Sequence, residues 1–177
     1  MSKLNFKDEI MKNRNNPIQD NWMTPPDLYE KWNKKYHFDF DPCPFNHNLD
    51  HWDGLIREWG DMNFVNPPYS QKTKEAFITI AATKSIFSRK DSFMLLPVST
   101  STVIYHGLMK RASRHIEFLE GRIHFIGINS KGQYVNYHQL QETTKETIEY
   151  EDPKKGLIEI PRFIKGPGQF DSMTVLF

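Results

Sequence analysis

The chain has 177 residues, of which 38% are hydrophobic and 14% aromatic, and a formal net charge of +1. This composition favours one folded domain and excludes a largely disordered chain. The balanced charge neither supports nor excludes nucleic acid as a partner. The single cysteine excludes an internal disulfide, and no apolar run is long enough to span a bilayer, so we expect a soluble, cytoplasmic protein without a membrane partner.

The first part of the chain predicts an arm, a helix and a strand. Residues 1–20 are polar and rich in asparagine, so we expect a flexible arm ahead of a single domain at 21–177. Apolar residues spaced by four predict a helix over 25–36, with Thr24 as its N-cap. Alternation over 38–41 predicts a short strand that ends in a carboxylate at a proline-stiffened turn. Ligands of open α/β sheets bind beyond such strand ends.

Two features of residues 43–59 bear on possible ligands. Cys43, His47 and His51 have a spacing that could suit a metal, but no second cysteine pair exists, so we expect no metal site. Asp53 begins a predicted turn, which a short helix over 55–59 follows. Asp53 is either a polar contact for a ligand or only a turn residue.

The stretch 62–70 organises the rest of the chain. A strand-length apolar run stops at Asn66, and two prolines then forbid both further ladder hydrogen bonds and an immediate helix. Tyr69 follows, and residues 71–87 predict a helix. An amide, a fixed carbonyl and an aromatic ring are thus delivered to one edge of a sheet. These groups suit a flat polar ligand, of which a nucleobase is the obvious candidate.

The second half of the chain predicts further strands around one more helix. The helix follows the hydroxyl-rich residues 99–102. The expected strands are 92–97, 115–119, 122–126 and 171–177, with the second and third joined as a pair at 120–121. Residues 127–168 form a polar insertion with one strand at 157–163. The predicted fold class is therefore α/β, with an abbreviated mixed sheet, helices on both faces and a polar insertion before the last strand.

The central motif suits the methylation of an exocyclic amine. Such an amine on adenine is a poor nucleophile because its lone pair is delocalised into the ring. The Asn66 side-chain oxygen and the Pro67 carbonyl can accept hydrogen bonds from it and direct its lone pair at an electrophilic methyl group. Tyr69 can stack on the base and hold it flat. Much of the catalysis would then come from orientation rather than from a strong base.

These residues resemble a known family. Asn66-Pro67-Pro68-Tyr69 is the signature of amino-methyltransferases that use S-adenosylmethionine and act on DNA adenine, RNA or protein glutamine. Around it stand Trp22-x-Thr24-Pro25, Phe38-Asp39-Phe40-Asp41-Pro42-Cys43, Asp53-Gly54-Leu55 with Trp59, Leu96-Pro97 and Gly121-Arg122-Ile123-x-Phe125. Together they resemble the small phage-type DNA N-6-adenine methyltransferases over residues 22–125 and the last strand.

The resemblance implies a small Rossmann-like methyltransferase fold, S-adenosylmethionine as cofactor and double-stranded DNA with a flipped-out adenine as substrate, in the host cytoplasm if a phage encodes the chain. It implies catalysis by Asn66, Pro67, Pro68 and Tyr69. The implied cofactor-binding residues are Trp22, Thr24, Pro25, Asp39, Asp41, Pro42, Cys43, Asp53 and Asn66, and the implied DNA contacts are Tyr69, Ser70, Lys72, Arg122 and Lys131. The chain departs from larger methyltransferases because no glycine-rich turn follows the strand that ends at residue 41.

Several alternatives stay open at the level of sequence. The same chemistry could act on RNA or protein glutamine, or the chain could be a catalytically degenerate module that binds DNA or protein. Arg122 could pair with Glu117 or Glu120 instead of contacting a phosphate. The insertion at 127–168 is hypothesised to touch DNA. Deleting about residues 130–155 should then abolish DNA binding and spare cofactor binding.

Overall fold

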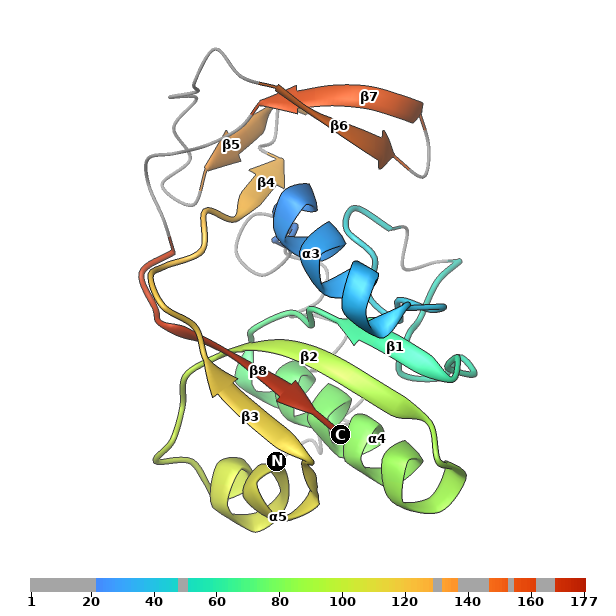
Figure 1. Cartoon of the computed structure of the whole chain (residues 1–177), viewed down its shortest axis with the longest axis vertical. Helices are drawn as coiled ribbons and strands as arrows, with labels where there is room; N and C mark the ends of the chain where they lie inside the picture. Colours follow the sequence, from blue (N-terminus) through green and yellow to red (C-terminus); the bar gives the residue numbers. More distant parts are fainter. Residues whose placement is uncertain (1–21, 48–50, 129–131, 137–146, 153–154, 162–167) are drawn as a thin grey trace, which may run out of the picture.

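A computed structural model describes residues 22–47, 51–128, 132–136, 147–152, 155–161 and 168–177. Its main sheet has four strands in the order β1-β2-β8-β3 (Figure 1). The strands β1 (Met62–Val65) and β2 (Asp91–Pro97) are parallel. The last strand, β8 (Ser172–Leu176), runs antiparallel to both β2 and β3 (His115–Phe118). The sheet is therefore mixed, and the predicted α/β class is confirmed.

Helices cover both faces of this sheet. The helix α3 (Pro26–Tyr36) lies over one face, and α4 (Gln71–Ser88) lies over the other with the short α5 (Lys110–Ala112) (Figure 1). Successive residues of a strand point to opposite faces, so Phe93 packs on the side of α3 and Met94 on the side of α4. Both faces of β2 are buried, which explains its continuous apolar sequence.

The start of α3 differs from the sequence prediction. Its N-cap residue is Pro25, and no side chain caps the helix. The prediction of Thr24 as N-cap is wrong, because the Thr24 hydroxyl accepts a hydrogen bond from the Asn66 side chain instead. The helix ends at Tyr36, where His37 adopts a left-handed conformation and donates its backbone N–H to the Asn33 carbonyl.

The segment between α3 and β1 contains less regular structure than predicted. The expected strand at 38–41 is reduced to one parallel bridge between Phe40 and Asn63. It stays short because the Asp39 carboxylate turns back to accept the backbone N–H groups of residues 61 and 62. The prediction of a helix at 55–59 is wrong, since residues 55–57 form a turn and a bend and residues 58–59 have no regular structure.

The helix predicted after residues 99–102 is present but irregular. A π-helical stretch, η1 (Tyr105–Met109), leads directly into α5. Met109 is buried against the α4 side of the sheet, whereas Val103 is 89% exposed. The sequence therefore predicts where this helix lies along the chain. It does not predict which of its apolar side chains point to the core.

The prediction that the strands 115–119 and 122–126 pair with each other across residues 120–121 is wrong. The strand β3 pairs with β8 from the end of the chain. The chain then leaves the main sheet, and β4 (Ile126–Ile128) pairs with β5 (Tyr134–Asn136) in a second sheet. The physical reason is that Ile123 and Phe125 are buried in the cluster on the α3 side instead of continuing a hairpin.

The predicted insertion holds more strands than the one expected. A third sheet consists of β6 (Thr147–Asp152) and β7 (Gly156–Pro161). Ile160 of β7 is fully buried in a small core with Met23 and Ile126. The β6–β7 hairpin lies on the far side of α3 from the main sheet (Figure 1), so this part of the insertion packs against the domain.

Candidate active site

The Asn66 amide lies just beyond the end of β1 and is held in one orientation. Its Nδ2 donates to the Trp22 carbonyl at 2.6 Å and to the Thr24 hydroxyl at 3.2 Å. A backbone carbonyl can only accept, so this contact decides which end of the amide carries the nitrogen. The Trp22 ring packs directly against Gly127, where an added Cβ would stand 2.7 Å from it. The Trp22 carbonyl and the Thr24 hydroxyl thus form a clamp on the nitrogen of the Asn66 amide. The amide oxygen is left as the group presented to a ligand.

Tyr69 lies on the other side of this amide. Its hydroxyl donates to Asn66 Oδ1 at 2.8 Å. An amide oxygen has two lone pairs, so one acceptor direction remains for a further donor. The Tyr69 ring meets Phe125 and Phe170 edge-on, with centroids 6.0 and 5.2 Å apart. Segments from three distant parts of the chain thus hold the motif.

The turn at residues 41–43 is tied to the same strand end. The Cys43 thiol donates to the Asn66 backbone carbonyl at 3.2 Å, and the Cys43 N–H donates to the Asp41 carboxylate at 2.8 Å. Burial raises the pKa of Asp41 to about 7, although the hydrogen bonds from Cys43 oppose that shift. Burial and the nearby Asp41 carboxylate also raise the pKa of Tyr29. Asp41 is therefore a carboxylate whose charge lacks a compensating cation among the described residues.

The segment 52–59 supports this turn from behind. The Trp52 indole donates to the Pro42 carbonyl at 3.0 Å, and the Trp59 indole donates to the Gly54 carbonyl at 2.8 Å. A Cβ at Gly54 would stand 1.8 Å from the Pro42 oxygen, so the two backbones touch here only because residue 54 is glycine. Asp53 accepts the Leu55 N–H at 2.9 Å, which is the behaviour of a turn residue.

These groups surround a cavity of about 450 Å³. Five of the residues expected to bind a cofactor line it, namely Trp22, Thr24, Asp41, Cys43 and Asn66. Its lining within the described part of the chain includes four acidic residues and no lysine or arginine; the acidic residues are Glu30, Asp41, Glu149 and Glu151. The cavity is therefore suited to a cation and unsuited to a phosphate.

Other expected site residues lie outside this lining. Pro42 is buried behind the turn, and Asp39 holds the backbone of residues 61 and 62. Pro25 faces a second cavity. Asp53 forms the turn described above. Ser70 is the N-cap residue of α4, Lys72 lies in the first turn of that helix, and Lys131 lies outside the described residues.

Sequence reasoning missed several aromatic residues of the cavity. Tyr29, Phe45 and Tyr150 line it, and none belongs to a motif. Tyr29 had a signal, since it lies on the predicted helix one position after the apolar stripe at Leu28, and Tyr150 had one in the alternation of apolar and acidic residues over 148–151.

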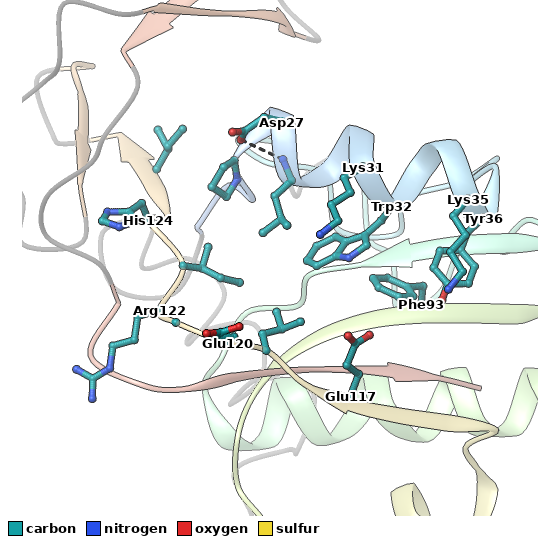
Figure 2. A pocket seen from close by; sticks show the side chains of 16 residues that line it. Asp27, Lys31, Trp32, Lys35, Tyr36, Phe93, Glu117, Glu120, Arg122 and His124 are labelled. Atoms are coloured by element: carbon teal, nitrogen blue, oxygen red, sulfur yellow. Dashed lines mark hydrogen bonds between the residues drawn. The ribbon is translucent and has the colours of Figure 1, made fainter.

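A second cavity of about 770 Å³ is bordered by a different set of α3 residues (Figure 2). Lys31 and Lys35 of the helix border it on one side and Glu117 and Glu120 on the other. Arg122 makes a 3.4 Å contact with Asp171 through its Nε, and not with either of these glutamates. Both partners of this contact are largely exposed, so it contributes little to stability.

The sequence profile of the family described as DNA N-6-adenine-methyltransferase (Dam) matches residues 12–143. The chain belongs to this family. Membership in the DNA N-6-adenine-methyltransferase family indicates a methyltransferase that acts on adenine in DNA, and the predicted resemblance is confirmed. No curated protein and no solved structure matches the chain. Among the described residues, no helix is long and apolar enough to cross a membrane.

Proposed function

We propose that this chain transfers a methyl group from S-adenosylmethionine to the exocyclic N6 amine of adenine in DNA. The observation that carries the proposal is the clamped Asn66 amide, whose oxygen is presented beside a cavity with Asp41 and other acidic residues in its lining. An intact and oriented amide also argues against a catalytically degenerate binding module.

The cavity fits the proposed cofactor by its chemistry. S-adenosylmethionine supplies an electrophilic methyl group on a positively charged sulfonium. The Asp41 carboxylate can offset that charge, and the aromatic rings of Tyr29 and Phe45 can contact the flat, apolar part. Thr24 and Cys43 line the cavity next to Asn66. The residues that would hold the cofactor therefore adjoin the amide that would hold the acceptor amine.

The protein would activate the amine by orienting it. The free lone pair of Asn66 Oδ1 and the Pro67 carbonyl accept its two hydrogens, so that the nitrogen lone pair points towards the cavity. Tyr69 contacts the base, which must leave the duplex to reach this position. No strong base is required before the transfer. The methyl group would pass from the sulfonium to the amine nitrogen as the S–C bond breaks, neutral S-adenosylhomocysteine would be left, and the positively charged nitrogen would then release its extra proton to solvent.

The remaining assignments extend this proposal to the whole chain. A single Rossmann-like methyltransferase domain at 21–177 would follow an arm at 1–20. Double-stranded DNA would contact Tyr69, Ser70, Lys72 and Arg122 together with the region 127–168. The exposure of Arg122 supports a phosphate contact, since its pairing with Asp171 is weak.

The proposal is tested by offering labelled S-adenosylmethionine to the purified protein with unmethylated DNA, RNA and protein side by side. Label that enters DNA alone supports it. Label that enters only RNA or only protein would move the same chemistry to another acceptor. Absence of label in all three, with the protein folded, would contradict an enzymatic function.

Tyr69 should contribute more through its ring than through its hydroxyl. Tyr69→Phe removes the hydrogen bond to Asn66 Oδ1 and keeps a surface for the base, so we expect kcat to fall by roughly tenfold or less. Tyr69→Ala should lower kcat by about a hundredfold or more, because stacking and orientation are both lost. Single-turnover rates of the two variants check this, with equal cofactor affinity as the control. Equal rates for both variants would refute a contact between the ring and the base.

Cofactor affinity should depend on pH through Asp41. Burial raises the pKa of this carboxyl to about 7, so below that pH the protein holds it neutral and the cation loses its partner. Affinity should rise by roughly tenfold between about pH 6 and pH 8, and Asp41→Asn should be weak and nearly independent of pH. Calorimetric titrations at several pH values measure this, with the exposed Asp171→Asn as a control that keeps the wild-type profile. A flat wild-type profile would remove Asp41 from the cation site.

A further inference from the structure

One wall of the cofactor cavity comes from outside the segment that the family profile matches. The match ends at residue 143, whereas β6 begins at Thr147. Glu149, Tyr150 and Glu151 of this strand line the cavity. The β6–β7 hairpin lies beside α3 (Figure 1), and another face of this helix borders the second cavity. This chain therefore completes the site with a hairpin that follows the matched segment.

Of the three residues, Tyr150 is the one that also belongs to the small core described above. The strand register pairs it with Ile158, and both pack against the small core of Met23 and Ile160. Residues on either side of Tyr150 point to the opposite face, and Leu157 on β7 is 69% exposed. Tyr150 thus belongs both to the cavity lining and to the small core, whereas Glu149 and Glu151 point away from that core.

The cavity has two chemically different parts. The polar part is held together by hydrogen bonds among Thr24, Asn66 and Cys43. The aromatic part contains Phe45 and Tyr150, which belong to the core cluster of Met23. Met23 joins the two, because its backbone pairs with Ile126 in both directions at 2.8 and 3.1 Å and its neighbours in sequence form the Asn66 clamp.

Resting on the proposed function, we propose that Tyr150 is a cofactor-binding residue that packs on the adenine ring of S-adenosylmethionine. The methyl group must lie beside Asn66, where the acceptor amine is held. The flat nucleobase of the cofactor then occupies the part of the cavity away from Asn66, between Phe45 and Tyr150. Aromatic side chains bind a nucleobase through its π-face, and this contact needs no polar partner.

The inference is tested by replacing Tyr150 in the full chain and measuring two ligands by calorimetry. S-adenosylhomocysteine carries both the nucleoside and the amino acid, and 5′-methylthioadenosine carries only the nucleoside. Tyr150→Ala should bind both about tenfold more weakly, within the range that base stacking on an aromatic ring supplies. Tyr150→Phe keeps the ring and should bind both within about twofold of the wild type. Leu157→Ala, an exposed position on the same hairpin, is the matched control and should change neither affinity.

Each result bears on a different claim. If the wild type binds both ligands and Tyr150→Ala binds them equally well, the inference is overturned and the proposed function stands. A loss for S-adenosylhomocysteine but not for 5′-methylthioadenosine would also overturn it, since Tyr150 would then contact the amino-acid end. A wild type that binds neither ligand would overturn the proposed function together with this inference. A melting temperature of Tyr150→Ala close to that of Leu157→Ala shows that lost affinity is not lost fold.

Discussion

Asn66→Ala is expected to lower methyl transfer by about a hundred- to a thousandfold. The variant loses the oxygen that is presented beside the cavity, and nothing else in the motif can accept from the amine in the same direction. S-adenosylmethionine should still bind within about threefold of the wild type, because the carboxylate and the aromatic walls of the cavity remain. Single-turnover methylation and a calorimetric titration of the same preparation measure the two quantities.

Gln71→Ala is the matched control for this variant. Gln71 is an exposed amide only a few residues further along, and its side chain bonds Glu75 on the same helix at 3.1 Å. Its replacement should leave both rate and affinity unchanged. A normal methylation rate in Asn66→Ala would refute the role of the amide. A joint loss of rate and cofactor binding would show instead that Asn66 supports the cavity.

Gly54→Ala is expected to damage the cofactor cavity from a distance. The added Cβ would meet the Pro42 carbonyl at 1.8 Å, and this atom belongs to backbone that cannot rotate away. The turn that carries Asp41 must therefore shift. We expect a loss of about 2–4 kcal/mol in the free energy of unfolding and at least a tenfold loss of cofactor affinity. Chemical denaturation and calorimetric titration check the two effects.

Gly107→Ala is the matched control, because it replaces a glycine at a position where the added Cβ touches no other atom. An added Cβ at Gly107 meets nothing within 4 Å, and its backbone lies in η1. The variant should be as stable as the wild type or slightly more stable, because alanine restricts the unfolded chain. Wild-type stability and affinity in Gly54→Ala would contradict the view that this segment supports the turn at residues 41–43.

The segments whose apolar residues follow a clear strand or helix pattern were predictable from the sequence. The apolar run before Asn66 and the helical spacing after Ser70 correspond to β1 and α4. The pairing of strands was not predictable in the same way. Alternation around Glu120 is compatible with a hairpin, but β8, more than fifty residues later, takes the place beside β3. Local alternation identifies a strand and contains no information on its partner.

The site was partly predictable for a similar reason. The sequence placed Asn66, Asp41 and Thr24 in one site, and the structure brings these three to one cavity. It could not show that Trp22 would act through its backbone carbonyl, because every residue has one. Tyr150 lies in a charged run, where the acidic residues Glu149, Glu151 and Asp152 obscure the short alternation that marks a strand.

The structure also changes the interpretation of one experiment. Deleting about residues 130–155 was expected to remove DNA binding alone. The deletion would also remove β5 and β6, and with β6 the wall that contains Tyr150. We now expect it to weaken cofactor binding as well. Point variants such as Tyr150→Ala and Arg122→Ala therefore separate the two effects more cleanly.

The central claim concerns which atom receives the methyl group. Unmethylated double-stranded DNA is incubated with the protein and S-adenosylmethionine, digested to nucleosides and analysed by mass spectrometry, with Asn66→Ala as the matched control. We predict N6-methyldeoxyadenosine in the wild-type reaction and at most traces of it with the variant. Methylation of another base, or equal amounts of N6-methyldeoxyadenosine in both reactions, would contradict the account.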